Sequence, residues 1–130
     1  MKIEQFVELF AAMQFLLIGA SHVLQHKAWA EFFTHLSRYG KAGVFIHGLI
    51  SVSFGSIIVA GHNVWTGPAA VLTVTGWFYM LKSAHSFLIP SIGVKTLNQV
   101  KNRSSRVFIA PGVVMVAVGI LSAYCGLNLH

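Results

Sequence analysis

The sequence predicts an all-α protein of the polytopic membrane class, built as a four-helix transmembrane bundle with a short amphipathic interfacial helix. Three observations predict this class. The 130 residues are 55% hydrophobic and only 9% charged, their apolar residues gather in four long runs, and the basic residues fall between those runs. A soluble domain is about 25% charged, so this composition excludes a soluble or disordered chain.

The four apolar runs cover residues 6–24, 43–60, 69–89 and 107–127. At about 1.5 Å per helical residue, each run can cross a hydrocarbon core of about 30 Å. Lipid offers no partners to free backbone groups, so we expect each run to be a helix. The first run begins after an acidic head and lacks the pattern of a cleaved signal peptide, so we expect it to be retained. Residues 1–130 should therefore form a single four-helix transmembrane domain.

Basic residues predict the orientation of this bundle. The connections 25–42 and 90–106 lie on one side, which carries almost all of the Lys and Arg residues, while the other side holds Lys2. The asymmetry predicts a multi-pass protein of a bacterial inner membrane, with both connections in the cytoplasm and both termini in the periplasm. The basic residues on the cytoplasmic side are Lys27, Arg38, Lys41, Lys95, Lys101, Arg103 and Arg106.

The two cytoplasmic connections differ in pattern. Apolar residues recur at helical spacing within 27–39, which predicts the amphipathic interfacial helix, ended by Gly40. The connection 90–106 reads as a basic loop. Both suit the headgroups of anionic inner-leaflet lipids, and the placement of the charges between apolar runs argues against a nucleic-acid partner.

Polar residues inside the spans are the candidates for a function. Such residues are rare at membrane depth and tend to face the bundle interior. We expect several of them to meet near the cytoplasmic mouth and to line a path for a substrate or for protons. The alternative is that each one points separately to the headgroups. Lys82 could line the path, but its position near the helix end favours snorkelling towards the cytoplasm, and Glu8 is expected to point to the outer interface. The residues of the expected path are His22, His47, His85, Lys82, Tyr79, Ser51 and Gln14.

Two other functions remain open beside small-solute or proton transport. Imidazoles ligate haem iron and other metals, so His22, His26, His47 and His85 could make a redox subunit that holds haem b or a metal ion, or that handles quinone. A scaffold or assembly subunit without catalysis is the third class. We predict no cofactor under the transport interpretation, and no conventional catalytic set is present, so the pattern disfavours an enzyme.

Small residues follow two spans at helical intervals and favour close helix packing. The sequence does not decide whether they pack inside the bundle or against another subunit, and we expect a homo-oligomer or a membrane partner subunit. The residues are Gly48, Gly55, Gly112, Gly119 and Gly126.

One set of local motifs resembles a known group of proteins. The motifs are Gly19-Ala-Ser-His22, residues 25–33, His62-Asn-Val-Trp65, Leu72-Thr73, Gly76-Trp77, Lys82 and Pro90. They resemble a group of small bacterial four-helix integral membrane proteins of uncharacterised function and, more distantly, the DoxX-like proteins in size and helix count. The resemblance implies the four-helix fold and a bacterial inner membrane, and it implies no catalytic or binding residue.

Overall fold

The computed structural model describes residues 1–128 and 130, and within them every regular element is helical. The chain forms α1 (Ile3–Leu24), α2 (His26–Arg38), α3 (Lys41–Gly61), α4 (Ala70–Leu88), α5 (Pro90–Lys101), the short 3-10 helix η1 (Ser105–Phe108) and α6 (Ile109–Asn128). The all-α prediction is confirmed.

Three of the four expected spans are long and apolar enough to cross a membrane, namely α1, α3 and the combined segment Ser105–Asn128. The chain thus has the features of a multi-pass membrane protein. The expected span 69–89 does form α4, but this helix is less apolar than the others because it carries polar residues along its second half. These polar residues are Tyr79, Lys82, Ser83, His85 and Ser86.

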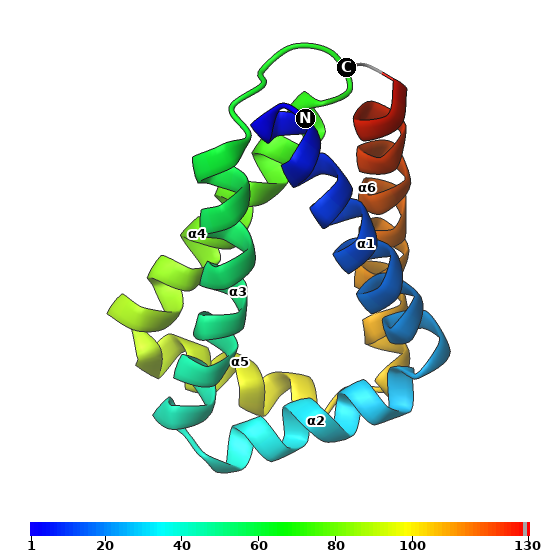
Figure 1. The fold of residues 1–130 in the computed structure, drawn as a ribbon. Helices are drawn as coiled ribbons and strands as arrows, with labels where there is room; N and C mark the ends of the chain where they lie inside the picture. Colours follow the sequence, from blue (N-terminus) through cyan, green and yellow to red (C-terminus); the bar gives the residue numbers. More distant parts are fainter. Residues whose placement is uncertain (129) are drawn as a thin grey trace.

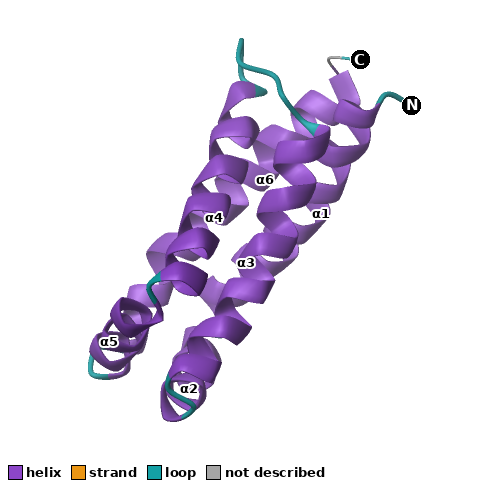
Figure 2. Cartoon of the chain, turned by 90° about the vertical axis from the view of Figure 1, so that its left-hand side faces the viewer, coloured by secondary structure: helices purple, strands orange, loops and turns teal. Residues whose placement is uncertain are grey.

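The long helices form two antiparallel pairs, α1 with α6 and α3 with α4 (Figure 1). The pairs meet at the end that carries both termini and the loop 62–69, which we call the terminal end. They diverge towards the opposite end, where α2 and α5 lie side by side and cross the gap (Figure 2). We call this the basic end, because the basic connections identified in the sequence lie there.

The apolar core lies between the two pairs towards the terminal end. Val7, Ala11 and Phe15 of α1 pack there with Ile58 of α3 and Leu72 of α4, each no more than 3% exposed. The Phe15 ring also stacks with Phe54 and Tyr79 at centroid distances of 6.2 and 5.9 Å. This layer of side chains closes the interior between the terminal end and the basic end.

The connection 90–106 is not the loop that the sequence suggested, because its first twelve residues form α5. Pro90 stands in the first turn of α5, where its missing N–H is tolerated. Leu97 is buried against Leu36 of α2 and Val44 of α3. The signal for this helix in the sequence is the spacing of Gly93, Leu97 and Val100 at steps of four and three.

The amphipathic helix expected over 27–39 is confirmed as α2. Gly40 follows it with a φ of 58°, a backbone conformation that glycine adopts without steric cost. Gly43 then brings α3 against the carbonyl of Leu36, where a Cβ atom would collide. These two glycines make the sharp corner between α2 and α3.

The glycine stripe of α6 packs inside the bundle, which answers the question left open by the sequence. A Cβ atom on Gly112 would lie 2.8 Å from the Gly19 carbonyl oxygen, and one on Gly119 would lie 2.9 Å from Cγ of Leu16. Gly126 meets Leu9 in the same way. The whole stripe therefore faces α1 and fixes the close approach of the two helices.

The glycines of α3 face the other partner. A Cβ atom on Gly55 would lie 2.9 Å from the backbone nitrogen of Met80, and Gly48 lies against Phe87. Close packing of α3 on α4 thus depends on glycines at the contact, as does the packing of α1 on α6.

Replacing Gly119 by Leu should force α6 away from α1. Overpacking of this kind costs about 1–3 kcal/mol or more, so we expect a lower thermal unfolding temperature in detergent. The matched control is Ala117→Leu, which adds a similar side chain on the exposed face of α6. Equal unfolding temperatures for the two variants would contradict the packing described above.

Candidate functional site

A cavity of about 410 Å³ lies between the two helix pairs on the basic side of the Phe15 layer. The long helices form its walls, and α2 and α5 line it towards the basic end through Trp29, Phe33 and Leu97. This size lies within the range of small-molecule sites, about 300–1,000 Å³. The cavity exists because the pairs diverge below the apolar core.

The wall formed by α3 and α4 holds the polar groups of an otherwise mostly apolar cavity, beside apolar side chains such as Val44 and Phe54. Its side chains carry imidazole, hydroxyl and ammonium groups, and in the described part of the chain His47, Lys82 and His85 make no hydrogen bond to protein. The lining residues of this kind are His47, Ser51, Tyr79, Lys82, His85 and Ser86.

The facing wall is apolar and mostly aromatic. It comes from α1, α2, η1 and α6, and its rings contact one another: Phe33 stacks on Phe108 at 5.1 Å, and Trp29 meets Phe32 edge to face at 5.6 Å. The main side chains of this wall are Phe15, Ile18, Trp29, Phe32, Phe33, Phe108 and Met115. The cavity is therefore mostly apolar, with its polar groups gathered on the side of α3 and α4.

Lys82 points into the cavity and not towards the basic end. Its Nζ lies 5.7 Å from the centroid of the Tyr79 ring, and Tyr79 stands one turn nearer the terminal end of α4. Side chains of a helix lean towards its N-terminus, which for α4 is the terminal end. The snorkelling interpretation of Lys82 is therefore wrong.

His22 belongs to the aromatic wall. Its ring stacks on Trp29 with centroids 4.0 Å apart, and its Nδ1–H donates to the carbonyl oxygen of Ile18 at 2.9 Å. The Trp29 Nε1–H in turn donates to the hydroxyl of Ser21 at 2.9 Å. These contacts hold α2 against α1 and leave His22 only 6% exposed.

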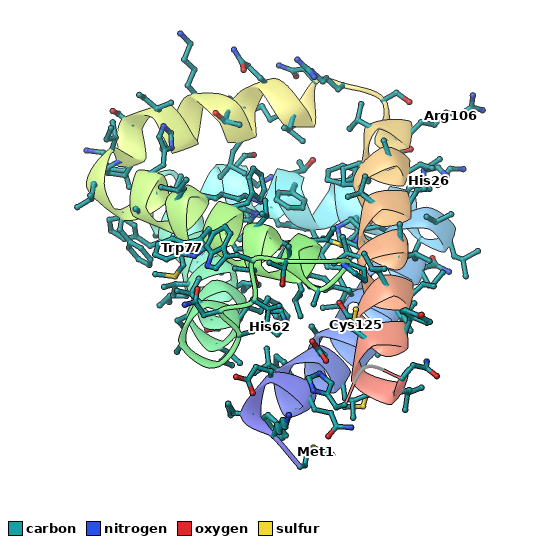
Figure 3. All side chains as sticks on the ribbon, turned by 90° about the horizontal axis from the view of Figure 1, so that it is seen from above. Met1, His26, His62, Trp77, Arg106 and Cys125 are labelled. Atoms are coloured by element: carbon teal, nitrogen blue, oxygen red, sulfur yellow. The ribbon has the colours of Figure 1, made fainter. Side chains whose placement is uncertain are left out.

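Most residues of the expected path thus meet at one cavity: His22, His47, His85, Lys82, Tyr79 and Ser51 all line it. Two candidates do not. Gln14 lies outside the lining, and His26 lies at the rim of the molecule near Arg106, where its Nδ1 is 2.9 Å from the Ser105 hydroxyl (Figure 3).

A second polar cluster lies at the terminal end, where Glu8 is buried and does not point to the interface as we expected. Glu8 is 1% exposed and His62 is fully buried, and Oε1 of Glu8 lies 2.9 Å from Nε2 of His62. The other carboxylate oxygen lies 2.6 Å from Nε2 of His130. Both oxygens of this carboxylate therefore have partners.

Thr73 continues this cluster into α4. Its hydroxyl donates to the carbonyl oxygen of Val64 at 2.7 Å, while its oxygen accepts from the Val64 N–H at 3.2 Å and lies 2.9 Å from Nδ1 of His62. The hydroxyl proton is thus directed at Val64, which assigns the proton of the 2.9 Å contact to Nδ1. The hydrogen-bonded chain Glu8–His62–Thr73 joins α1, the end of α3 and α4.

The sequence contains a signal for Glu8 that we overlooked. Glu8 stands in the same register as Ala12, Phe15, Gly19 and His22, at alternating steps of four and three, and all five are buried. A carboxylate in a buried stripe must have partners. His62, the first residue of the motif His62-Asn-Val-Trp65, lies just beyond the end of α3 and belongs to this cluster.

The described residues do not gather into a metal centre, since no three His, Cys, Asp or Glu side chains among them could hold one ion. The chain also matches no protein-family model, no curated protein and no solved structure. The interpretation of the cavity rests on its own geometry.

Replacing His62 by Ala should leave Glu8 buried without its main partner. Breaking a buried pair on one side costs about 3–5 kcal/mol, so we expect a large loss of stability against chemical unfolding in detergent. Glu31→Ala, which removes an exposed carboxylate of α2, should have little effect. A His62→Ala protein as stable as the Glu31→Ala protein would contradict the role of the buried chain.

Proposed function

We propose that this chain is a small multi-pass membrane protein that binds a small molecule in the cavity and carries it across or within the membrane. In this proposal α4 crosses the membrane together with the three more apolar spans. The observation that carries the proposal is that His47, Lys82 and the more exposed His85 converge on one cavity, where their side chains have no hydrogen-bond partner among the described residues. Polar groups at membrane depth are costly and are retained chiefly for a function.

The geometry favours a carrier over a channel. The packed layer around Phe15, Ile58 and Leu72 separates the cavity from the terminal end. A continuous path would have to cross this layer, whereas a carrier needs a site that is closed on one side at a time. The basic end is then the side from which the molecule reaches the site.

The redox alternative has less support. His22 is packed flat on Trp29, and His47 and His85 come from the adjacent helices α3 and α4. Two axial haem ligands must face one another across the ring. The four histidines are therefore poorly arranged for haem, and His26 stands apart from them.

The charge distribution supports an orientation with the basic end in the cytoplasm. A phosphatase that is active only in the periplasm should then be active when it is fused after His130. A fluorescent reporter that matures in the cytoplasm should stay dark at the same position. The reverse pattern would invert the orientation and place the cavity towards the periplasm.

Access to the cavity can be tested with a single cysteine. Ser51→Cys in a Cys125→Ser background places a thiol of similar size in the lining. A small charged methanethiosulfonate should label it in right-side-out and inverted vesicles at very different rates, about ten-fold or more apart, with the faster rate from the basic side.

The native Cys125 gives the control, because it is buried near the terminal end outside the cavity lining. Labelling of Ser51→Cys as slow as that of Cys125 would contradict a solute site. Equal labelling from both sides would indicate an open pore and would overturn the carrier.

A further inference from the structure

The division of the cavity into two walls restricts what it can hold. A polar solute would leave the rings of Trp29, Phe33 and Phe108 without apolar contact, and a pure hydrocarbon would leave Lys82 and His47 without hydrogen bonds. Both mismatches are unfavourable, because buried polar groups need partners and apolar surface is stabilised by apolar contact. The two faces fit a molecule that is itself polar at one end and apolar at the other.

The charge of the polar wall restricts the ligand further. Among residues 1–128 and 130, the ion pairs involve only Glu8, at the terminal end, so Lys82 has no carboxylate partner there. The sequence has three acidic residues in all. Of the other two, Glu31 is exposed on α2 and Glu4 lies in the first turn of α1, at the terminal end. The cavity therefore presents an ammonium group that the described protein does not neutralise.

The position of Lys82 fits an anion in the cavity better than one at the surface. Its ammonium group is turned towards Tyr79, away from the headgroups. The hydroxyls of Tyr79 and Ser51 line the same wall and can donate further hydrogen bonds, whereas the Ser86 hydroxyl already donates to the carbonyl oxygen of Lys82 at 3.1 Å. The basic residues of α2 and α5 would raise the local concentration of anions at the basic end.

We propose, on the basis of the carrier function above, that the ligand is a single-chain anionic amphiphile, with a carboxylate head against Lys82 and a hydrocarbon tail against Trp29 and Phe33. The head group exchanges hydration for a charge-assisted hydrogen bond in a site of low dielectric. The tail buries apolar area against the aromatic wall. The ligand is drawn from the leaflet at the basic end, since α2 lies there with its aromatic residues.

Fluorescence of Trp29 can report the ligand directly. Trp65 and Trp77 are 57% and 44% exposed, so Trp65→Phe and Trp77→Phe should leave a folded protein whose emission comes from Trp29 alone. Dibromostearate, added to this protein in phosphatidylcholine vesicles, should quench the emission in a saturable way, and unbrominated stearate should reverse the quenching.

The lysine is tested by three substitutions in the same background. Lys82→Met should raise the half-saturating concentration of dibromostearate about ten-fold or more, as expected for loss of a charge-assisted hydrogen bond. Lys82→Arg should stay within about three-fold of the parent, since it keeps the charge. Lys95→Met removes an exposed charge of α5 outside the cavity lining and should bind like the parent.

Two further probes separate the sources of quenching. The matching brominated alcohol lacks the anionic head and should quench weakly and without saturation. A brominated two-chain phosphatidylglycerol should quench equally in the parent and in Lys82→Met, as lipid at the outer surface of α2 would.

Three results would overturn the proposal. The brominated acid and alcohol could quench Trp29 equally, or Lys82→Met could leave quenching by dibromostearate unchanged. The third is that quenching by phosphatidylglycerol depends on Lys82 while quenching by stearate does not. The cysteine experiment keeps this failure distinct from that of the carrier. If Ser51→Cys is labelled from the basic side while quenching by stearate is independent of Lys82, the carrier function is retained and the proposed ligand class is rejected. If Ser51→Cys is unreactive and stearate does not quench, both fall.

Discussion

The buried hydrogen-bonded chain Glu8–His62–Thr73 is the interaction on which the arrangement of the helix pairs depends. It joins α1 to the end of α3 and the start of α4, next to the apolar layer of Val7, Ile58 and Leu72. A buried carboxylate is tolerated only with partners, so this contact specifies one way for the pairs to meet. Because the pairs are joined tightly at the terminal end, they are free to diverge at the other.

The divergence would leave polar and aromatic side chains facing an open gap without the two helices that cross it. Trp29 on α2 packs on His22 of α1, and Leu97 of α5 packs between α2 and α3. The floor of the cavity, formed by α2 and α5, is therefore packed directly against the helices that form its walls. The two helices border a cavity at the depth where the polar residues of α3 and α4 lie.

The sequence predicted the helical class, three of the apolar spans and α2 because each leaves a strong periodic or compositional pattern. It also predicted that His22, His47 and His85 would approach one another, since their positions near one membrane face follow from helix geometry alone. Side-chain direction was harder to predict. Whether Lys82 points inwards, and whether Glu8 is buried, depends on which face of a helix meets its neighbour, and that is decided by contacts between distant residues such as Glu8 and His62.

The connections between walls and floor have a mechanical consequence. Gln25 alone separates α1 from α2, and Ile89 alone separates α4 from α5. A one-residue connection allows little independent motion, so α1 should move together with α2, and α4 together with α5. If a bound molecule widens the space between α1 and α4, α2 and α5 must slide or tilt against each other where they are in contact. Any change in the spacing of α1 and α4 is thereby passed on to α2 and α5 at the basic end.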